Sequence, residues 1–377
     1  NLFTQSSCIV AQEIKKPVIV GAERTYTYFM DLQGKRLGVV ANQTSLVGQT
    51  HLVDSLVGAG FNVVKAFGPE HGFRGDAGAG DEIENNIDVK TGIPVISLYG
   101  KHKKPTPEDL LGIDLMIFDI QDVGARFYTY ISTLTYVMEA CAENKIPLIV
   151  LDRPNPHGDY IDGPMLNPVY SSFVGLHPVP VVYGMTIGEY AMMVNGESWL
   201  KDSVQCDLKV IQLDGYTHKT HYELPVPPSP NLPNNTAIQL YPSLCFFEGT
   251  IISVGRGTDY PFQVIGHPDF MVGSFDFVPR DIPGKAMDPP YEGIRCYGHS
   301  LVGYAENVQD TIRQLNLFYL LEMYKVLGKS HDFFNPFFDK LAGTDQLRKQ
   351  IISGMTEEEI RESWQKDIQA FKEIRKK

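Results

Sequence analysis

The stretch Asn62-Val-Val-Lys-Ala-Phe-Gly-Pro-Glu-His-Gly-Phe-Arg-Gly75 joins a short apolar run to a glycine-rich turn that carries an ionisable pair. Residues 62–67 have the length and the β-branched content of a buried strand, and a proline and two glycines end it sharply. Glu70 and His71 therefore stand at the carboxyl end of a predicted strand. Open α/β sheets bind their ligands at this end of their strands, so we predict that the pair belongs to a catalytic site.

Similar apolar runs recur between residues 36 and 152, and each is followed by a turn and a helical or loop return. Nearly continuous apolar runs are typical of parallel strands that helices cover on both faces. The pattern predicts an α/β fold with a Rossmann-like, doubly wound parallel sheet. The other strands of this pattern are predicted at Arg36–Ala41, Pro94–Leu98, Asp114–Ile120 and Pro147–Leu151, and a further strand is predicted at Asp207–Leu213. Helices are predicted at His51–Ala59, from Thr106 onward, at Ile131–Asn144 and at Thr186–Leu200.

Each strand in this first part is followed by side chains that form hydrogen bonds. Because the carboxyl ends of parallel strands meet at one edge of a sheet, we expect these side chains to converge in one crevice. They are Asn42 and Gln43, Glu70 and His71, Tyr99, Gln121 and Asp122, and Asp152, Arg153 and Asn155. The alternative is that they are ordinary polar residues of surface loops.

A chain of 377 residues with 43% hydrophobic content is long enough for two cores. Residues 223–233 contain five prolines, which exclude a regular element there and indicate a linker or a site-lining loop. We predict a Rossmann-like catalytic domain at 18–222 and a smaller α+β domain at 223–377, with the site in the cleft between them. The second domain has predicted strands at Thr250–Val254 and Phe262–Ile265, a long helix at Val308–Val326 and a final helix after a capping box at Thr356.

Charge and motifs exclude several classes of function. The balance of 33 basic against 45 acidic residues gives a net charge of -12, which opposes binding to nucleic acid or to an anionic membrane. No run of 18 apolar residues exists, so no helix is predicted to span a membrane. The glycine cluster at 75–80 does not have the dinucleotide spacing, and His218 and His221 have no HExxH partner. We therefore predict no cofactor and no metal site.

Residues 1–17 resemble the remnant of an export signal, so the protein is predicted to be exported to the periplasm or the extracellular space. A disordered N-terminus is the alternative for this segment, and whether Cys8 carries a lipid is left open. The other cysteines are scattered without a CxxC pair, which indicates buried thiols. The sequence leaves the oligomeric state open.

Carboxylates are the predicted catalytic groups. Glu70, Asp122 and Asp152 follow three different strands, and two carboxylates on one rim suit hydrolysis of a glycosidic bond. Glu70 lies between two phenylalanines in sequence, so we expect burial to raise its pKa and to make it a general acid. The alternative is a structural ion pair of Glu70 with Arg74 or Arg126.

Cations and aromatic rings at the same rim are predicted to bind substrate. Arg126, Arg153 and Arg256 suit a substrate carboxylate, although each also has an aspartate nearby in sequence. Tyr99 and Tyr128 suit a stacking wall for a sugar ring.

Several motifs together resemble the DUF1343 family, which includes exo-β-N-acetylmuramidases. They are Ala41-Asn-Gln-Thr-Ser45, Gly68–Gly75, Phe118–Tyr130, Asp152-Arg-Pro-Asn-Pro156, Glu248-Gly-Thr250 and Ser253–Thr258, and the resemblance runs from about Val18 to the end. It implies removal of N-acetylmuramic acid from the non-reducing end of peptidoglycan fragments, without a cofactor. It also implies that Glu70 is the catalytic glutamate. Arg74 and Glu248, which lie in these motifs, and Asn231, in a positioning turn of the proline-rich segment, complete the predicted substrate-binding residues.

The mechanism is left open at this point. Asp122 or Asp152 is one candidate for the second catalytic group, and the acetamido oxygen of the substrate is the other. Arg153 or Arg256 is predicted to bind the lactyl carboxylate that distinguishes muramic acid from glucosamine. A non-catalytic binder of muramyl sugars, or a hydrolase of shifted sugar specificity, is the alternative function.

Overall fold

The computed structural model describes residues 16–75, 86–308 and 313–377. Nearly all of the predicted export remnant, including Cys8, and most of the glycine cluster at 75–80 lie outside these ranges. No helix in the described part of the chain is long and apolar enough to cross a bilayer.

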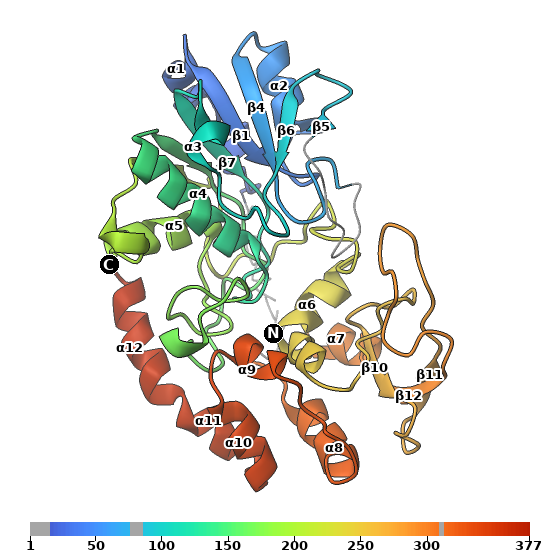
Figure 1. The fold of residues 1–377 in the computed structure, drawn as a ribbon. Coiled ribbons are helices and arrows are strands. Elements are labelled where there is room, and N and C mark those ends of the chain that lie inside the picture. Colours follow the sequence, from blue (N-terminus) through green and yellow to red (C-terminus); the bar gives the residue numbers. More distant parts are fainter. Residues whose placement is uncertain (1–15, 76–85, 309–312) are drawn as a thin grey trace, which may run out of the picture.

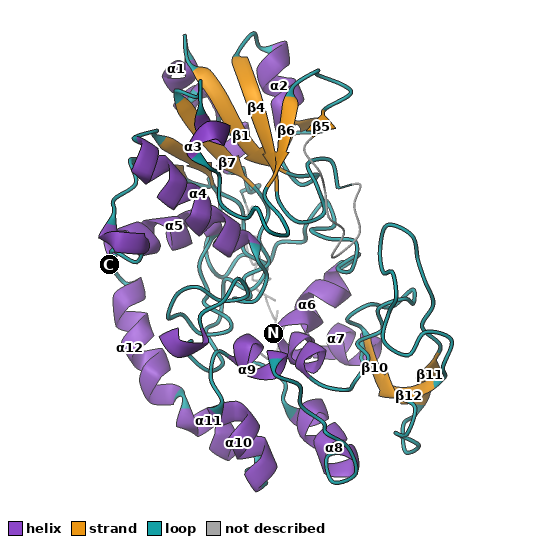
Figure 2. Ribbon diagram, viewed as in Figure 1, coloured by secondary structure: helices purple, strands orange, loops and turns teal. Residues whose placement is uncertain are grey.

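A seven-stranded sheet forms the first part of the molecule (Figures 1 and 2). All neighbouring strands pair in parallel except the short edge strand β5. In spatial order they are β5 (Asn86–Ile87), β6 (Pro94–Ser97), β4 (Asn62–Gly68), β1 (Arg36–Ala41), β7 (Leu115–Asp119), β8 (Leu148–Leu151) and β9 (Leu208–Ile211). The fold class is confirmed. The predicted strands of the first part are also confirmed, and their observed ends differ from the predicted ends by no more than two residues.

Side chains of the central strand β1 alternate between two apolar cores. Leu37 and Val39 pack on one face of the sheet, together with Leu56 of helix α2, whereas Val40 packs on the other face, together with Leu134 of helix α4. Burial on both faces explains why the strands are nearly continuous in apolar residues. The helices of this part are α1 (Phe29–Leu32), α2 (Leu52–Gly58), α3 (Pro107–Leu110), α4 (Tyr130–Asn144) and α5 (Ile187–Gly196), and a small hairpin pairs β2 (Leu46–Val47) with β3 (Thr50–His51).

The strand order reverses at β1. The chain builds outward from β1 to β4 and β6, and then crosses back to β7, β8 and β9. Doubly wound sheets open a crevice at the carboxyl ends of the strands where the order reverses. In Figure 2 the arrowheads of β1, β4 and β6 point toward the loops between the sheet and α6.

The second part of the molecule combines a small antiparallel sheet with helices. The sheet has the order β10 (Val264–His267), β12 (Cys296–Ser300), β11 (Phe275–Phe277). The helices are α6 (Asn235–Leu244), α7 (Val302–Val308), α8 (Phe318–Leu327), α9 (Phe337–Ala342), α10 (Gln346–Ser353), α11 (Glu357–Ser363) and α12 (Gln365–Arg375). The last three lead back toward the first part (Figure 1), where Lys377 pairs with Glu197 just after α5. The predicted boundary at 222/223 stays a prediction.

Two predictions for the second part are wrong. Thr250–Val254 is not a strand, because only single bridges form there, at Thr250 and Ser253. Within the predicted helix Val308–Val326, Val308 ends α7, the described residues 313–317 are not helical, and α8 begins at Phe318. Side chains hold the non-helical residues, because the Leu315 amide donates to Asp162 and the Phe318 amide donates to Asn316.

The final helix is partly as predicted. Thr356 forms the expected capping box with Glu359, and α11 starts there. It ends at Ser363, and α12 begins at Gln365 after the shared cap residue Trp364, so the one predicted helix is two helices. The Trp364 indole donates to Asp162, which lies in the loop that follows the first sheet's β8, and this bond fixes the bend.

Candidate active site

A cavity of about 570 Å³ lies between the carboxyl ends of the first sheet and the second part. The proline-rich segment 223–233 supplies Ser229, Asn231 and Leu232 to its wall, so this segment is a site-lining loop. Among the predicted site residues, Glu70, His71, Tyr99, Tyr128, Asn231, Glu248 and Arg256 line the cavity.

Glu70 and His71 occupy a tight turn directly after β4. The Gly72 amide donates to the Pro69 carbonyl at 3.0 Å, and His71 has the left-handed φ of 70°. This conformation is uncommon for a residue other than glycine, and such residues concentrate at functional sites. The Glu70 side chain is half-buried and His71 is buried.

Two residues at the start of α4 hold Glu70 in place. The Thr129 hydroxyl donates to Glu70 Oε2 at 3.2 Å, and the Tyr130 hydroxyl donates to the Glu70 carbonyl at 3.4 Å. Neither of the arginines that sequence reasoning considered as partners of Glu70 contacts it. Arg74 binds Asp54 and Asp88 through paired hydrogen bonds, all between 2.8 and 3.1 Å, outside the cavity.

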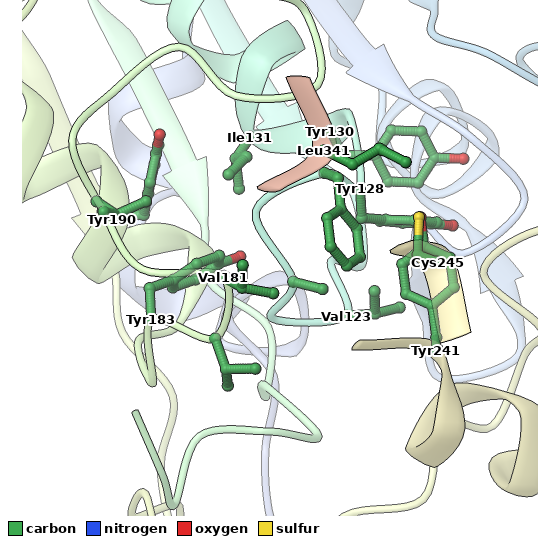
Figure 3. Packing of buried hydrophobic residues seen from close by; sticks show 14 of the residues in the cluster. Val123, Tyr128, Tyr130, Ile131, Val181, Tyr183, Tyr190, Tyr241, Cys245 and Leu341 are labelled. Atoms are coloured by element: carbon green, nitrogen blue, oxygen red, sulfur yellow. The ribbon is translucent and has the colours of Figure 1, made fainter. Parts of the chain in front are cut away.

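Tyrosines form one wall of the cavity. Tyr128 packs edge-to-face against Tyr130 and Tyr241, with ring centroids 4.8 and 5.7 Å apart (Figure 3). Burial raises the pKa of the Tyr128 hydroxyl well above its usual range, and the nearby Tyr130 adds to this effect. Neutral rings with hydroxyl groups at the edge of a cavity suit the faces and the hydroxyls of a sugar.

Glu248 and Arg256 face the cavity from the second part as an ion pair. Arg256 Nε donates to Glu248 Oε1 at 2.7 Å, and Nη2 lies 2.6 Å from the same oxygen. The guanidinium also lies over the Phe262 ring, 5.2 Å from its centroid. Glu70 and Glu248 are the carboxylates that line the cavity among the described residues.

Two lysines on the cavity were missed by sequence reasoning. Lys103, in the loop after β6, lies over the Phe173 ring with Nζ 4.4 Å from the centroid. Lys340, on α9, is exposed at the rim. No ion pair is formed by either lysine within the described ranges. Together with Arg256 they give the cavity three cations.

Asp122 lies beneath the tyrosine wall and does not line the cavity. It is 4% exposed, and it accepts hydrogen bonds from the Gly124 amide at 2.7 Å and from the Tyr183 hydroxyl. Its other oxygen, Oδ1, has no partner among the described residues. Burial raises the pKa of Asp122 to about 6.

Asp152 also lies outside the cavity, where it holds the start of α5. It accepts from the Thr186 hydroxyl and the Gly188 amide, both at 2.8 Å, and from the Arg153 amide at 3.0 Å. Burial raises its pKa to about 7. These contacts account for an acidic residue at this strand end, because the first turn of a helix has unpaired amides.

Arg153 and Arg126 are buried away from the cavity. Arg153 forms a paired ion bridge with Asp119, at 2.6 and 2.8 Å. Arg126 donates to the carbonyls of Pro164, Val179, Leu341 and Ala342 at 2.7–3.0 Å, without a carboxylate partner among the described residues. Burial lowers the pKa of Arg126 to about 9.

The amide side chains predicted for the rim hold the loops together. Asn42 Oδ1 accepts from the Thr44 hydroxyl at 2.6 Å, and the Gln121 side-chain amide donates to the Pro154 carbonyl at 2.6 Å. Gln43 donates to two carbonyls of the proline-rich loop, at 3.1 and 3.2 Å, and Asn155 donates to the Met185 carbonyl at 2.7 Å. The strand ends therefore do meet, but these side chains lie behind the wall of the cavity.

An open cavity at the carboxyl end of a doubly wound sheet, with a carboxylate in a tight turn and a tyrosine wall, defines a class: an α/β protein with a site shaped for a polar ring compound. Family models make the assignment specific. Residues 37–236 match the N-terminal domain of exo-β-N-acetylmuramidase NamZ and residues 239–377 match its C-terminal domain. The chain belongs to the NamZ family.

Individual relatives agree with this assignment. The chain is 40% identical to the peptidoglycan β-N-acetylmuramidase NamZ of Bacillus subtilis, over 97% of this chain and 92% of that protein. A crystal structure of a DUF1343 family protein from Bacteroides fragilis superposes with a TM-score of 0.86 at 47% identity, covering 96% of this chain and 98% of that one. A second DUF1343 structure from the same organism gives 0.78 at 30% identity, covering 97% and 98%.

Proposed function

We propose that the chain is an exo-acting glycosidase that removes β-1,4-linked N-acetylmuramic acid from the non-reducing end of peptidoglycan fragments. The observation that carries this proposal is the placement of Glu70, in the turn after β4, on the wall of the cavity. Glu70 acts as the general acid, which protonates the oxygen of the leaving sugar. The likeness to the B. subtilis enzyme supplies the substrate class.

The cavity has the size and chemistry that one terminal sugar requires. Its volume of about 570 Å³ lies within the usual range of about 300 to 1,000 Å³ for small-molecule sites. The hydroxyl groups of Thr129 and Tyr130 fix the Glu70 turn, so the carboxyl group is held in one place before substrate arrives. The tyrosine wall offers a face for the ring.

Glu248 acts as the second catalytic carboxylate beside Glu70. From the sequence, this role was predicted for Asp122 or Asp152. It lines the cavity, and Arg256 holds it by two contacts to Oε1. We expect Glu248→Gln to lower kcat on the disaccharide about a hundredfold or more, because such groups contribute about 10² to 10⁴. A kcat within about threefold of native would contradict this role and would favour attack by the acetamido oxygen of the substrate.

The two lysines bind the lactyl carboxylate of the substrate. From the sequence, this role was predicted for Arg153 or Arg256. Arg153 is buried against Asp119, whereas Lys103 and Lys340 line the cavity and Arg256 does so beside Glu248. A lone charged contact in a half-open cavity contributes about 1.5 to 3 kcal/mol. Loss of a lysine should therefore weaken binding of the muramyl carboxylate selectively.

We expect Lys103→Met and Lys340→Met each to weaken inhibition by N-acetylmuramic acid about tenfold, and to leave inhibition by its lactyl methyl ester unchanged. The comparison of acid and ester isolates the charge. Lys101→Met, which changes an exposed lysine outside the cavity, is the matched control. Equal weakening toward acid and ester would show that the lysines act on the fold of the site and not on the carboxylate.

The proposed function is tested by hydrolysis of a chromogenic β-N-acetylmuraminide beside the matching β-N-acetylglucosaminide with the native chain. We expect release from the muraminide and little from the glucosaminide. Binding of the muraminide without release would favour a non-catalytic binder of muramyl sugars. Preferred release from the glucosaminide would indicate a hydrolase of shifted specificity.

Export also remains a proposal. It is supported by the composition of residues 1–17 and by a substrate class that belongs to the cell wall. Fractionation of cells that express the full gene tests it, since an exported protein is recovered with periplasmic or extracellular markers.

A further inference from the structure

Three side chains of the second part bring metal-ligating atoms together away from the cavity. His267 ends β10, Asp269 follows in the next turn, and His331 lies in the segment after α8. One ligand atom from each lies within 4.8 Å of the others. The two imidazole rings are 5.1 Å apart at an angle of 79°, and His331 Nε2 is 2.9 Å from Asp269 Oδ2.

The contacts of the two rings bring one nitrogen of each close to the carboxylate. The Asp269 amide donates to His267 Nδ1 at 3.1 Å, so this nitrogen carries a lone pair. His331 Nδ1 lies 2.9 Å from the Ser330 hydroxyl and 3.3 Å from the Leu327 carbonyl, so it either accepts from the hydroxyl or donates to the carbonyl. When it donates, His331 Nε2 presents a lone pair to Asp269 Oδ2 at 2.9 Å, and two acceptors at this distance repel each other unless a proton or a cation lies between them.

The surroundings match those of a ligating histidine. Metal-bound imidazoles typically donate their other N–H to a carbonyl or carboxylate, and the Leu327 carbonyl, 3.3 Å from His331 Nδ1, is placed to accept such a bond. His267 is 5% exposed, so the packing around its ring fixes the ring's orientation. Asp269 is open to solvent, which provides an entry path and room for water ligands.

We propose that His267, Asp269 and His331 form a binding site for a divalent ion of the zinc class. Two imidazoles and one carboxylate are ligands that Zn²⁺ prefers, and they leave a position for water. The ion links the end of β10 to the segment after α8, two pieces that are far apart in sequence. Its role is structural, because none of the three residues lines the cavity. This departs from the sequence prediction of no metal site, which rested on the absence of local ligand motifs.

The test is calorimetric titration of the full chain, freed of metal by chelation, with ZnSO₄. We expect one saturable event and a rise in Tm with added zinc, because an ion that binds only the folded state stabilises it. His267→Ala and His331→Ala should each weaken the event by at least about tenfold. His218→Ala is the matched control, since His218 faces a single carboxylate, Glu189, at 2.8 Å, and it should leave the event unchanged.

Cobalt gives a second readout that does not depend on stability. Visible absorption of Co²⁺ bound to the native chain should be lost in both histidine variants and kept in His218→Ala. Absence of a saturable zinc event, or an event of the same strength in both variants, overturns the proposal. In that case the three residues form only a His331–Asp269 ion pair.

Discussion

Glu70→Gln is expected to reduce hydrolysis of the MurNAc-GlcNAc disaccharide by about a thousandfold or more, because removal of a general acid costs about 10² to 10⁴ and the sugar leaving group needs a proton. The amide still accepts a hydrogen bond from Thr129, which donates to the native carboxylate at 3.2 Å. The variant should therefore fold with an unchanged Tm. The measurement is the rate of sugar release at saturating substrate.

The leaving group separates the possible roles of Glu70. A 4-nitrophenyl muraminide releases an acidic phenol that needs little protonation, so a general-acid role predicts a much smaller loss for Glu70→Gln on this substrate than on the disaccharide. Equal losses on both substrates would assign Glu70 to attack or stabilisation at the sugar carbon. Glu108→Gln, an exposed change in the first turn of α3, is the control for the loss of one carboxylate.

Arg126→Met is expected to lower the free energy of unfolding by about 3 kcal/mol or more, because buried polar groups left without partners cost about 1 to 3 kcal/mol each. The guanidinium is fully buried and donates to four backbone carbonyls. Two of these belong to Leu341 and Ala342 at the end of α9, the helix that brings Phe337 and Lys340 to the cavity. Loss of Arg126 should therefore also raise KM.

Urea unfolding measures the first effect and initial rates measure the second. Arg24→Met is the matched control, because Arg24 is partly exposed and bonds a single carbonyl, that of Gln212. It should change stability by less than about 1 kcal/mol. A similarly small change in Arg126→Met would contradict the role of Arg126 as the link between the first sheet and α9.

The parallel sheet could be predicted because its signal is local. Each strand is a short apolar run followed by a turn, and burial on both faces makes the run continuous, as in β1 and β7. The long helix expected at Val308–Val326 could not be excluded locally. Asp162, a residue of the first part, accepts a hydrogen bond from the Leu315 amide. The spacing of apolar residues around Leu315 does not indicate a contact with a residue so far away in the sequence.

The site was predictable only in part for the same reason. The strand-end rule led to Glu70 and His71, and also to Asp122, Asp152 and Arg153, because it identifies an edge of the sheet and not which side chains face the cavity. Away from the cavity, Asp122 is hydrogen-bonded to Tyr183 and Asp152 to Thr186. Arg153 forms an ion pair with Asp119.

The remaining cavity residues come from segments that sequence reasoning did not connect with the rim. Lys103 lies only four residues after Tyr99, so a wider reading of the β6 loop would have included it. Phe337 and Lys340 have no local signal, because α9 reaches the cavity through the contacts of Arg126.

The central claim is that the cavity at Glu70 removes single muramic acid residues from a chain end. Its most direct measurement is the time course of products from the tetrasaccharide MurNAc-GlcNAc-MurNAc-GlcNAc with the native chain and Glu70→Gln. We expect free N-acetylmuramic acid and a trisaccharide with terminal N-acetylglucosamine to appear first, and Glu70→Gln to form neither. Early release of disaccharides from internal cleavage, or undiminished release by Glu70→Gln, would contradict it.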